Sequence, residues 1–84
     1  MHMTYPYLTY DEDADVLYVS LADGDVAETR SLGDLRLIDV TEDGMVHGVE
    51  FVSASHGVDL DGVPFARLVA SVIGDSGLPL KTYD

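Results

Sequence analysis

The sequence contains no cysteine, and this absence removes several classes of site. Without thiols the chain forms no disulfide, no thiolate metal cluster and no cysteine nucleophile. It also lacks a recognisable secretory leader and any apolar run near the roughly 20 residues that a helix needs to cross a bilayer. We therefore expect a soluble, cytoplasmic protein whose stability depends on packing, helped by homo-oligomerisation.

Basic residues are scarce as well. Four Lys or Arg stand against 16 Asp or Glu, which gives a net charge of −12. Nucleic acids are bound largely through Lys and Arg, and anionic membrane surfaces repel a negative protein, so we expect neither as a partner. The charge excess keeps a small protein in solution, and it also favours encounter with a basic protein. A basic partner protein is therefore one expectation.

Strand patterns occupy the first two thirds of the chain. Apolar residues make up 46% of the 84 residues, a proportion typical of one globular domain. Five segments are rich in β-branched and aromatic residues and are predicted as strands, the third of them as a short edge strand: 7–10, 16–21, 26–32, 35–40 and 45–52. Asp43-Gly44 predicts a tight hairpin turn between the last two.

A helical pattern follows the strands. Five apolar residues recur at helical spacing and predict an amphipathic helix: Phe65, Leu68, Val69, Val72 and Ile73. We expect the helix to occupy residues 59–74, with Asp59 or Asp61 as its cap and Gly74 at its end. Residues 75–84 have no periodicity and are expected to form a tail that either docks on a neighbour or stays mobile.

Together these segments predict an α+β fold in a single domain that spans residues 1–84. Its small antiparallel β-sheet has four to five strands in a hairpin meander, and one C-terminal helix packs on one face. Leu17, Val19 and Leu21 share one side of their strand and should face this helix.

The segment YDEDADVLYVSL, residues 10–21, contains four carboxylates within five residues. Asp11, Asp13 and Asp15 match the first three ligand positions of an EF-hand loop, but the required Gly and Glu are missing further along. Asp side chains also bond their own backbone in turns, so we interpret the cluster as an exposed turn between two strands. A weak divalent-cation site at these three Asp residues is the alternative.

Residue types suited to catalysis occur in two places. The types of a hydrolytic triad come together in Ser53, Ser55, His56 and Asp59, but without the G-x-S-x-G pattern. Asp39 and Glu50 lie on the two arms of the second hairpin and could do acid–base work if they faced each other in a cleft. A domain this small seldom has a deep cleft. A small hydrolase or isomerase that uses Glu50, Asp39 or His56 is therefore the least favoured function.

The segments YDEDADVLYVSL, VAET and LIDVTEDGMVHGVEFVSAS resemble the small bacterial YuzE-like family of domains of unknown function. Its members share a YD-x-x-AD-x-LY opening and a D-x-x-x-x-G-x-x-x-G-x-E segment, which this chain matches between Tyr10 and about Ser55. The resemblance implies an α+β domain with an antiparallel sheet over residues 10–55, and it brings no catalytic residues or cofactor. It also raises interest in partner binding, in a context like that of toxin–antitoxin pairs. The later segment GVDLDGVPFARLVASVI is an extension, expected to serve as a lid or a dimer element.

These observations lead to three hypotheses of different classes. The first is a non-enzymatic protein-interaction module that forms a homodimer through edge strands or helices and binds a basic protein through its acidic surface. The second is a weak divalent-cation-binding domain, and the third is a small hydrolase or isomerase.

Overall fold

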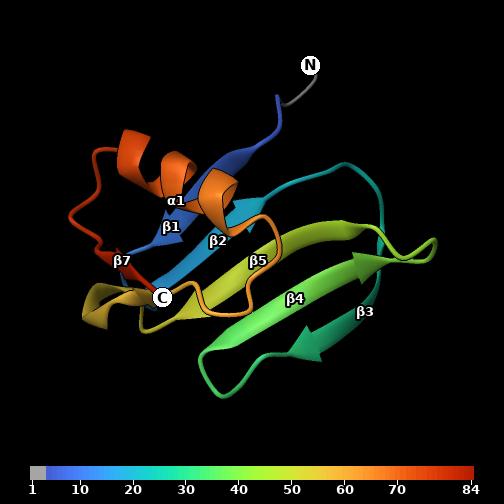
Figure 1. Ribbon diagram of the computed structural model, residues 1–84, viewed down its shortest axis with the longest axis horizontal. Coiled ribbons are helices and arrows are strands. Elements are labelled where there is room, and N and C mark those ends of the chain that lie inside the picture. The colour runs from blue at the N-terminus through green and yellow to red at the C-terminus, as the bar shows by residue number, and fades with distance from the viewer. Residues whose placement is uncertain (1–3) are drawn as a thin grey trace.

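The computed structural model describes residues 4–84. Within these residues the β-strands come first along the chain, followed by one α-helix and a short final strand (Figure 1). The elements are β1 (Tyr7–Asp11), β2 (Val16–Ser20), β3 (Val26–Ser31), β4 (Arg36–Thr41), β5 (Val46–Val52), one 3₁₀ turn (Ala54–His56), β6 (Val58–Asp59), α1 (Ala66–Asp75) and β7 (Thr82–Tyr83).

The first five strands form one antiparallel sheet, and the predicted α+β class is confirmed. The spatial order is β1-β2-β5-β4-β3, so the sheet is not one continuous meander. Two hairpin units, β1-β2 and β3-β4-β5, are joined where β2 pairs with β5. The chain crosses from β2 to the far edge of the sheet before β3 begins, which leaves β1 and β3 as the two edges (Figure 1).

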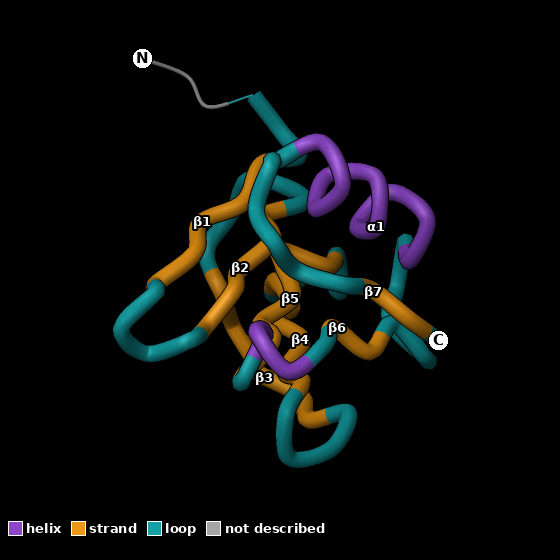
Figure 2. The backbone as a smooth tube through the Cα atoms, turned by 90° about the vertical axis from the view of Figure 1, so that its left-hand side faces the viewer, coloured by secondary structure: helices purple, strands orange, loops and turns teal. Residues whose placement is uncertain are grey.

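The hydrophobic core lies between the sheet and α1. In the β2–β5 pair, Leu17 is opposite Phe51 and Val19 is opposite Val49, and all four are buried. Because side chains alternate along a strand, these residues share one face, and α1 lies over this face (Figure 2). Each buried aliphatic side chain stabilises the fold by about 1.5–3 kcal/mol. The expectation that Leu17 and Val19 face the core is confirmed.

The helix is shorter than predicted. It was expected over residues 59–74, but α1 occupies Ala66–Asp75. Gly62 and Phe65 both have positive φ, 73° and 56°, so the chain turns twice before the helix starts. A helical backbone cannot pass through two left-handed residues, which explains the late start. Within the described part of the chain no helix is long and apolar enough to cross a membrane.

The predicted helix caps are also wrong. Asp59 lies in β6, where its Oδ1 accepts a hydrogen bond from the amide of Asp61 at 3.0 Å, and the residue before α1, Phe65, makes no side-chain cap. The C-terminal tail docks on the fold: β7 runs parallel to β6, and the amide of Leu60 donates to the carbonyl of Tyr83 at 2.6 Å. The docked form of the tail is the one present.

Candidate functional site

The acidic cluster was expected to be an exposed turn, but one of its members, Asp15, belongs to a hydrogen-bonded network. We call Tyr10, Asp15 and Ser55 the Asp15 network. The Asp15 carboxylate accepts hydrogen bonds from the Tyr10 hydroxyl (2.7 Å), the Ser55 amide (2.9 Å) and the Ser55 hydroxyl (2.6 Å). Asp15 has a φ of 57°, which Asp tolerates better than most residues. The network ties the β1–β2 turn to the segment after β5.

The network shifts the ionisation of its members. The hydrogen bonds from Ser55, and next the one from Tyr10, lower the pKa of Asp15, since they stabilise the charged carboxylate. The hydrogen bond to Asp15 is also the main cause that raises the pKa of Tyr10 to about 12. Asp15 is therefore a structural acceptor, and the sequence interpretation as a simple turn missed this role.

The other acids of the cluster are exposed, at the end of β1 and in the turn that follows it. Asp11 accepts a hydrogen bond from the amide of Ala14 at 3.1 Å, and Glu12 and Asp13 are exposed. Among residues 4–84, no group of three or more His, Cys, Asp or Glu side chains is placed to hold a metal ion. The weak cation site at Asp11, Asp13 and Asp15 stays a prediction, and Asp15 already has three hydrogen-bond donors.

A second polar network lies on the face of the sheet opposite the core. Asp39 accepts hydrogen bonds from the Tyr18 hydroxyl (2.7 Å) and from the Thr29 hydroxyl (2.6 Å), so it joins β2, β3 and β4 across β5. The Tyr18 ring crosses over Gly48, where an added Cβ would lie 2.5 Å from the Tyr18 oxygen. Burial and the hydrogen bond to Asp39 raise the pKa of Tyr18. We call Tyr18, Thr29 and Asp39 the Asp39 network.

Glu50 and His47 border the Asp39 network. Glu50 is the pairing partner of Tyr18 on β5, and its charge contributes to the raised pKa of Tyr18. The His47 ring centroid is 6.3 Å from that of Tyr18, and His47 Nδ1 is buried without a hydrogen-bond partner. Asp39 and Glu50 therefore share a face, as the acid–base hypothesis required. However, the Asp39 carboxylate already accepts hydrogen bonds from two hydroxyls of its own chain.

The residue types of the hydrolytic triad are not brought together as a relay. Ser55 donates its hydroxyl proton to Asp15, while His56 is exposed at the end of the 3₁₀ turn. Asp59 lies close to Arg36, whose Nη2 is 3.9 Å from Asp59 Oδ2. A relay needs hydrogen bonds from nucleophile to base and from base to acid, and neither bond is present among these residues.

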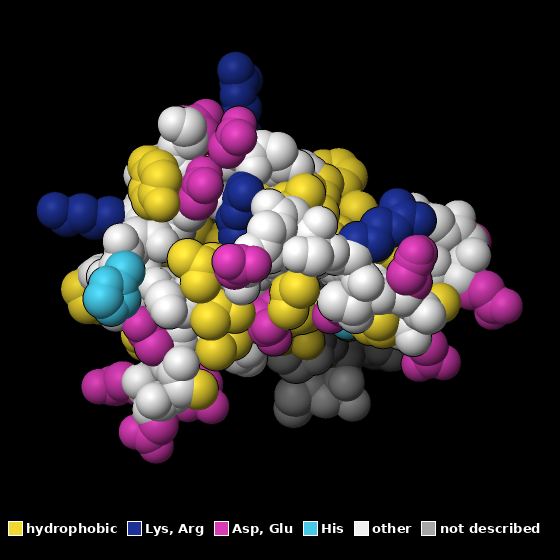
Figure 3. Space-filling view, turned by 90° about the horizontal axis from the view of Figure 1, so that it is seen from below, with side chains coloured by type: hydrophobic (Ala, Val, Ile, Leu, Met, Phe, Trp, Pro, Cys, Tyr) yellow, Lys and Arg dark blue, Asp and Glu magenta, His cyan; other side chains and the backbone are white. Residues whose placement is uncertain are grey.

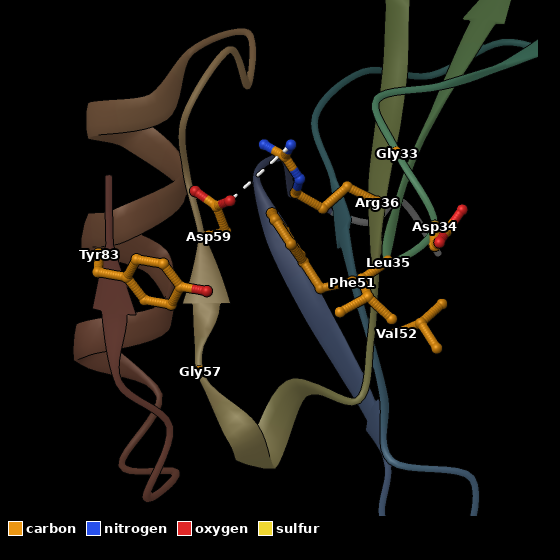
Figure 4. Close-up of a pocket in the computed structure, with 9 residues that line it drawn as sticks. All are labelled: Gly33, Asp34, Leu35, Arg36, Phe51, Val52, Gly57, Asp59 and Tyr83. Atoms are coloured by element: carbon orange, nitrogen blue, oxygen red, sulfur yellow. Dashed lines mark ion pairs between the residues drawn. The ribbon is translucent and has the colours of Figure 1, made fainter.

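A pocket of about 300 Å³ lies between the sheet and the C-terminal segment (Figure 4). Arg36 points into it toward Asp59, and its guanidinium also donates to the carbonyls of Leu32, at 2.9 Å, and Asp61. The Tyr83 ring covers Gly57, where a Cβ would lie 2.8 Å from the ring. Arg36 therefore contacts three groups of its own chain, the Asp59 carboxylate and the carbonyls of Leu32 and Asp61. We interpret the pocket as a structural contact between the sheet and the C-terminal segment.

An apolar groove of about 340 Å³ lies beside the start of α1. We call it the Phe65 groove; it is lined by Leu21, Ala22, Gly44, Met45, Val46, Phe65 and Leu68. Three of these apolar residues are exposed: Met45 is 55% exposed, Phe65 62% and Leu68 43%. Phe65 and Leu68 were predicted on the buried side of the helix, and this prediction is wrong. Val69 and Ile73 make the core contacts instead.

The exposure of Phe65 follows from the backbone. With its φ of 56°, Phe65 adopts a left-handed conformation that is a genuine outlier for a bulky residue. Such conformations cost on the order of 1–3 kcal/mol and tend to cluster at binding sites. The turn at Gly62 and Pro64 precedes it in sequence, and this was the signal that could have placed Phe65 outside the helix.

Acidic side chains border the Phe65 groove on one side. Met45 also lines an adjoining hollow between two loops, whose other lining residues are Asp23, Gly24, Asp25, Thr41, Glu42 and Asp43. The four acids are exposed, and Asp43 has a lowered pKa because the Thr41 hydroxyl donates to it. Acidic side chains also project around the face of the molecule in Figure 3, with apolar side chains between them.

The fold and these surfaces define a small α+β domain with two polar networks and an apolar groove. The family model called "Protein of unknown function (DUF2283)" matches residues 8–55, and the chain belongs to this family. The match includes β1 from its second residue, β2 to β5 and both polar networks, whereas β6, α1 and β7 lie beyond it. Comparison with curated proteins and with solved structures finds no match.

Proposed function

We propose that this domain is a non-enzymatic protein-interaction module that binds a basic, amphipathic segment of a partner protein. The observation that carries the proposal is the Phe65 groove, an apolar hollow with acidic loops on one side. Exposed apolar residues gathered in one hollow are typical of binding surfaces.

The chemistry of the groove selects the class of partner. Apolar side chains of the bound segment would lie against Phe65, Leu68 and Met45, where they remove apolar surface from water. Lys or Arg side chains on the border of the same segment would face Asp25 and Glu42. This is the pattern of an amphipathic helix laid into a groove, with charge complementarity at the rim.

The net charge acts at longer range. At −12 the protein attracts basic partners and increases their rate of encounter, and salt weakens this effect. The charge alone selects no site on the surface. The groove supplies the contact surface, which separates specific binding from general attraction.

The test uses a synthetic helical peptide of Leu and Lys in amphipathic order, and a counterpart with Glu in place of Lys. Fluorescence anisotropy should show binding of the basic peptide and none of the acidic one. Phe65→Ser should weaken the basic peptide by about tenfold or more, because it removes a large apolar contact. Amide shifts on titration should concentrate on the groove residues.

A matched pair of double variants separates the groove from general attraction. Asp25→Asn with Glu42→Gln and Glu12→Gln with Asp13→Asn each remove two negative charges from exposed positions. The second pair lies in the β1–β2 turn, at the other end of β2 from the groove. The first pair should weaken binding and the second should not. Equal weakening by both pairs, together with no effect of Phe65→Ser, would contradict the proposal.

Narrower expectations accompany this proposal. The YuzE-like resemblance, the cytoplasmic location and the toxin–antitoxin-like context stay predictions. The alternative function is the weak divalent-cation domain with Asp11, Asp13 and Asp15 as ligands, and calorimetry with Ca²⁺, Mg²⁺ and Mn²⁺ tests it. Heat that disappears when all three Asp residues are changed to Asn would support that alternative.

A further inference from the structure

Among residues 4–84, no strand pairs with the outer edge of β3. β3 pairs with β4 on one side and ends the sheet on the other, far from the side that α1 covers (Figure 1). All six residues of β3 are exposed. Such an edge presents a row of unpaired N–H and C=O groups that can pair with another strand.

The register of β3 on β4 defines which groups are free. The amide of Leu32 donates to the carbonyl of Arg36 at 2.9 Å, directly after β3 ends. In an antiparallel pair, residues alternate between those bonded to the neighbouring strand and those turned away from it. Arg30 and Glu28 therefore bond to β4, while the backbone groups of Thr29 and Ser31 face the free edge.

The charges on β3 are arranged symmetrically about Thr29. Glu28 and Arg30 flank it and form an ion pair of 3.2 Å within the strand. Their side chains remain 51% and 63% exposed, so both are accessible to a second strand. We infer that β3 pairs antiparallel with β3 of a second copy of this chain, about a two-fold axis at Thr29. Each copy's Glu28 then faces the other copy's Arg30, and the two sheets become one.

Charge selects this register among the neighbouring ones. An axis at Glu28 or at Arg30 would place like charges opposite each other, and an axis at Ser31 would leave Glu28 without an opposite residue on the strand, because β3 ends at Ser31. Like charges directly opposite are destabilising, whereas opposite charges stabilise a cross-strand pair. In the Thr29 register the free backbone groups are also paired, because the two Thr29 residues exchange both hydrogen bonds.

Two features of the chain limit the strength of this dimer. The register shift between Val26 and Glu28 is a bulge that ends the regular ladder near Ala27. The net charge of −12 on each copy also opposes association, so the local Glu28–Arg30 pairs must offset it. We therefore expect a reversible, concentration-dependent dimer. The inference does not depend on the Phe65 groove, because no residue of the groove lies on β3.

The test exchanges the charges. Glu28→Arg gives an edge with two positive charges, and Arg30→Glu gives an edge with two negative ones, so each variant alone should dimerise about tenfold or more weakly than the unchanged chain. Combining both substitutions in one chain should restore the dimer. An equimolar mixture of the two single variants should form a mixed dimer, because each edge then faces its complement.

Sedimentation over a concentration series measures the affinities, and native mass spectrometry identifies the mixed dimer by its mass. Circular dichroism of each variant checks that it folds. Amide exchange gives a second readout, since the amides of Thr29 and Ser31 should be protected only at concentrations where the dimer forms. An unchanged chain that stays monomeric throughout, or single variants that dimerise as well as the unchanged chain, would overturn the inference.

Discussion

β2 and β3 are strands of similar length in the same sheet, and their environments are opposite. Three of the five residues of β2 are buried, whereas all six residues of β3 are exposed. Both strands carry β-branched residues, so intrinsic preference does not separate them. The difference in burial follows from position in the sheet. β2 lies between β1 and β5 beneath α1, whereas β3 lies at an edge beyond the helix (Figure 1). Burial in this domain is decided by which strand the helix reaches.

The first prediction tests this contrast with one truncation on each strand. Leu17→Ala on β2 should lower the free energy of unfolding by about 2–5 kcal/mol, because Leu17 is fully buried opposite Phe51. Val26→Ala on β3 should lower it by less than about 1 kcal/mol, since Val26 is 45% exposed. Urea denaturation followed by circular dichroism measures both. Similar losses for the two variants would mean that β3 is buried, for example within a persistent dimer.

The comparison of β2 with β3 also shows which parts of the fold could be predicted from the sequence. The sheet strands could be predicted because β-branched and aromatic residues recur along them, only weakly in β3, and because Asp43-Gly44 marks a turn. The order of the strands in the sheet could not be predicted, because β2 pairs with β5 and this pairing joins residues far apart in sequence, such as Leu17 and Phe51. Local pattern also failed at Phe65, where spacing indicated helix but two left-handed residues delay its start.

The candidate site was predicted less well than the fold, for a related reason. Asp39 was noticed as a carboxylate on a hairpin, but its donor Tyr18 is 21 residues away on β2, and the pattern gave no sign that the Thr29 hydroxyl on the preceding strand also reaches it. Asp15 was noticed within the acidic cluster, yet its donor Ser55 is 40 residues further along. Sequence periodicity assigns a side chain to a face; it does not identify the residue beside it on the next strand.

The second prediction concerns how the β3–β4 side is held in place without burial. Arg36 at the start of β4 bonds the carbonyls of Leu32 and Asp61, so it joins the β3–β4 turn to the C-terminal segment. Arg36→Met should lower the free energy of unfolding by about 1–3 kcal/mol, because both carbonyls lose a charged donor. The amide of Leu60, which bonds Tyr83 in β7, should exchange faster.

The exposed Arg67 on α1 is the matched control for that prediction. Arg67→Met removes the same charge and should change stability by no more than about 0.5 kcal/mol. If Arg67→Met had the larger effect, or if exchange at Leu60 were unchanged in Arg36→Met, the role given to Arg36 would be wrong.

The third prediction concerns the Asp15 network on the β2 side. Asp15→Asn keeps a residue that tolerates the left-handed backbone but removes the carboxylate that Ser55 and Tyr10 bond. At neutral pH the variant should unfold at a lower urea concentration than the unchanged chain. Asp13→Asn, an exposed neighbour in the same turn, should leave the unfolding midpoint unchanged.

The pH dependence of this difference has a defined sign. The pKa of Asp15 is lowered in the folded state, so its stabilisation is fully present above the unfolded value of about 3.9 and is lost as the pH falls through the folded pKa. The gap between the unchanged chain and Asp15→Asn should therefore narrow below about pH 4. A gap that is constant through the acid range would show that the carboxylate charge is not what stabilises the turn.

The smallest expected effects come from removing the two hydrogen-bond donors of Asp39, Tyr18 on β2 and Thr29 on β3. Tyr18→Phe on β2 removes a half-buried hydroxyl and should lower the free energy of unfolding by about 1 kcal/mol. Thr29→Val on β3 removes an exposed hydroxyl and should cost no more than about 0.5 kcal/mol, because water replaces the lost donor and Val suits a strand. A larger loss for Thr29→Val would reverse the contrast between the strands.

High pH separates the ionisation of Tyr18 from the loss of a simple contact. Burial and the bond to Asp39 raise the pKa of Tyr18, so its stabilisation is complete below the unfolded value of about 10 and is lost as the pH rises toward the folded one. The stability gap between the unchanged chain and Tyr18→Phe should therefore narrow above about pH 10, as measured by urea denaturation. Tyr10, whose pKa is raised to about 12, titrates in both chains and cancels in the difference. If this stability difference grew as the pH rose, the folded protein would tolerate ionised Tyr18 beside Asp39 and Glu50. The role given to the Asp39 network in keeping Tyr18 neutral would then be wrong.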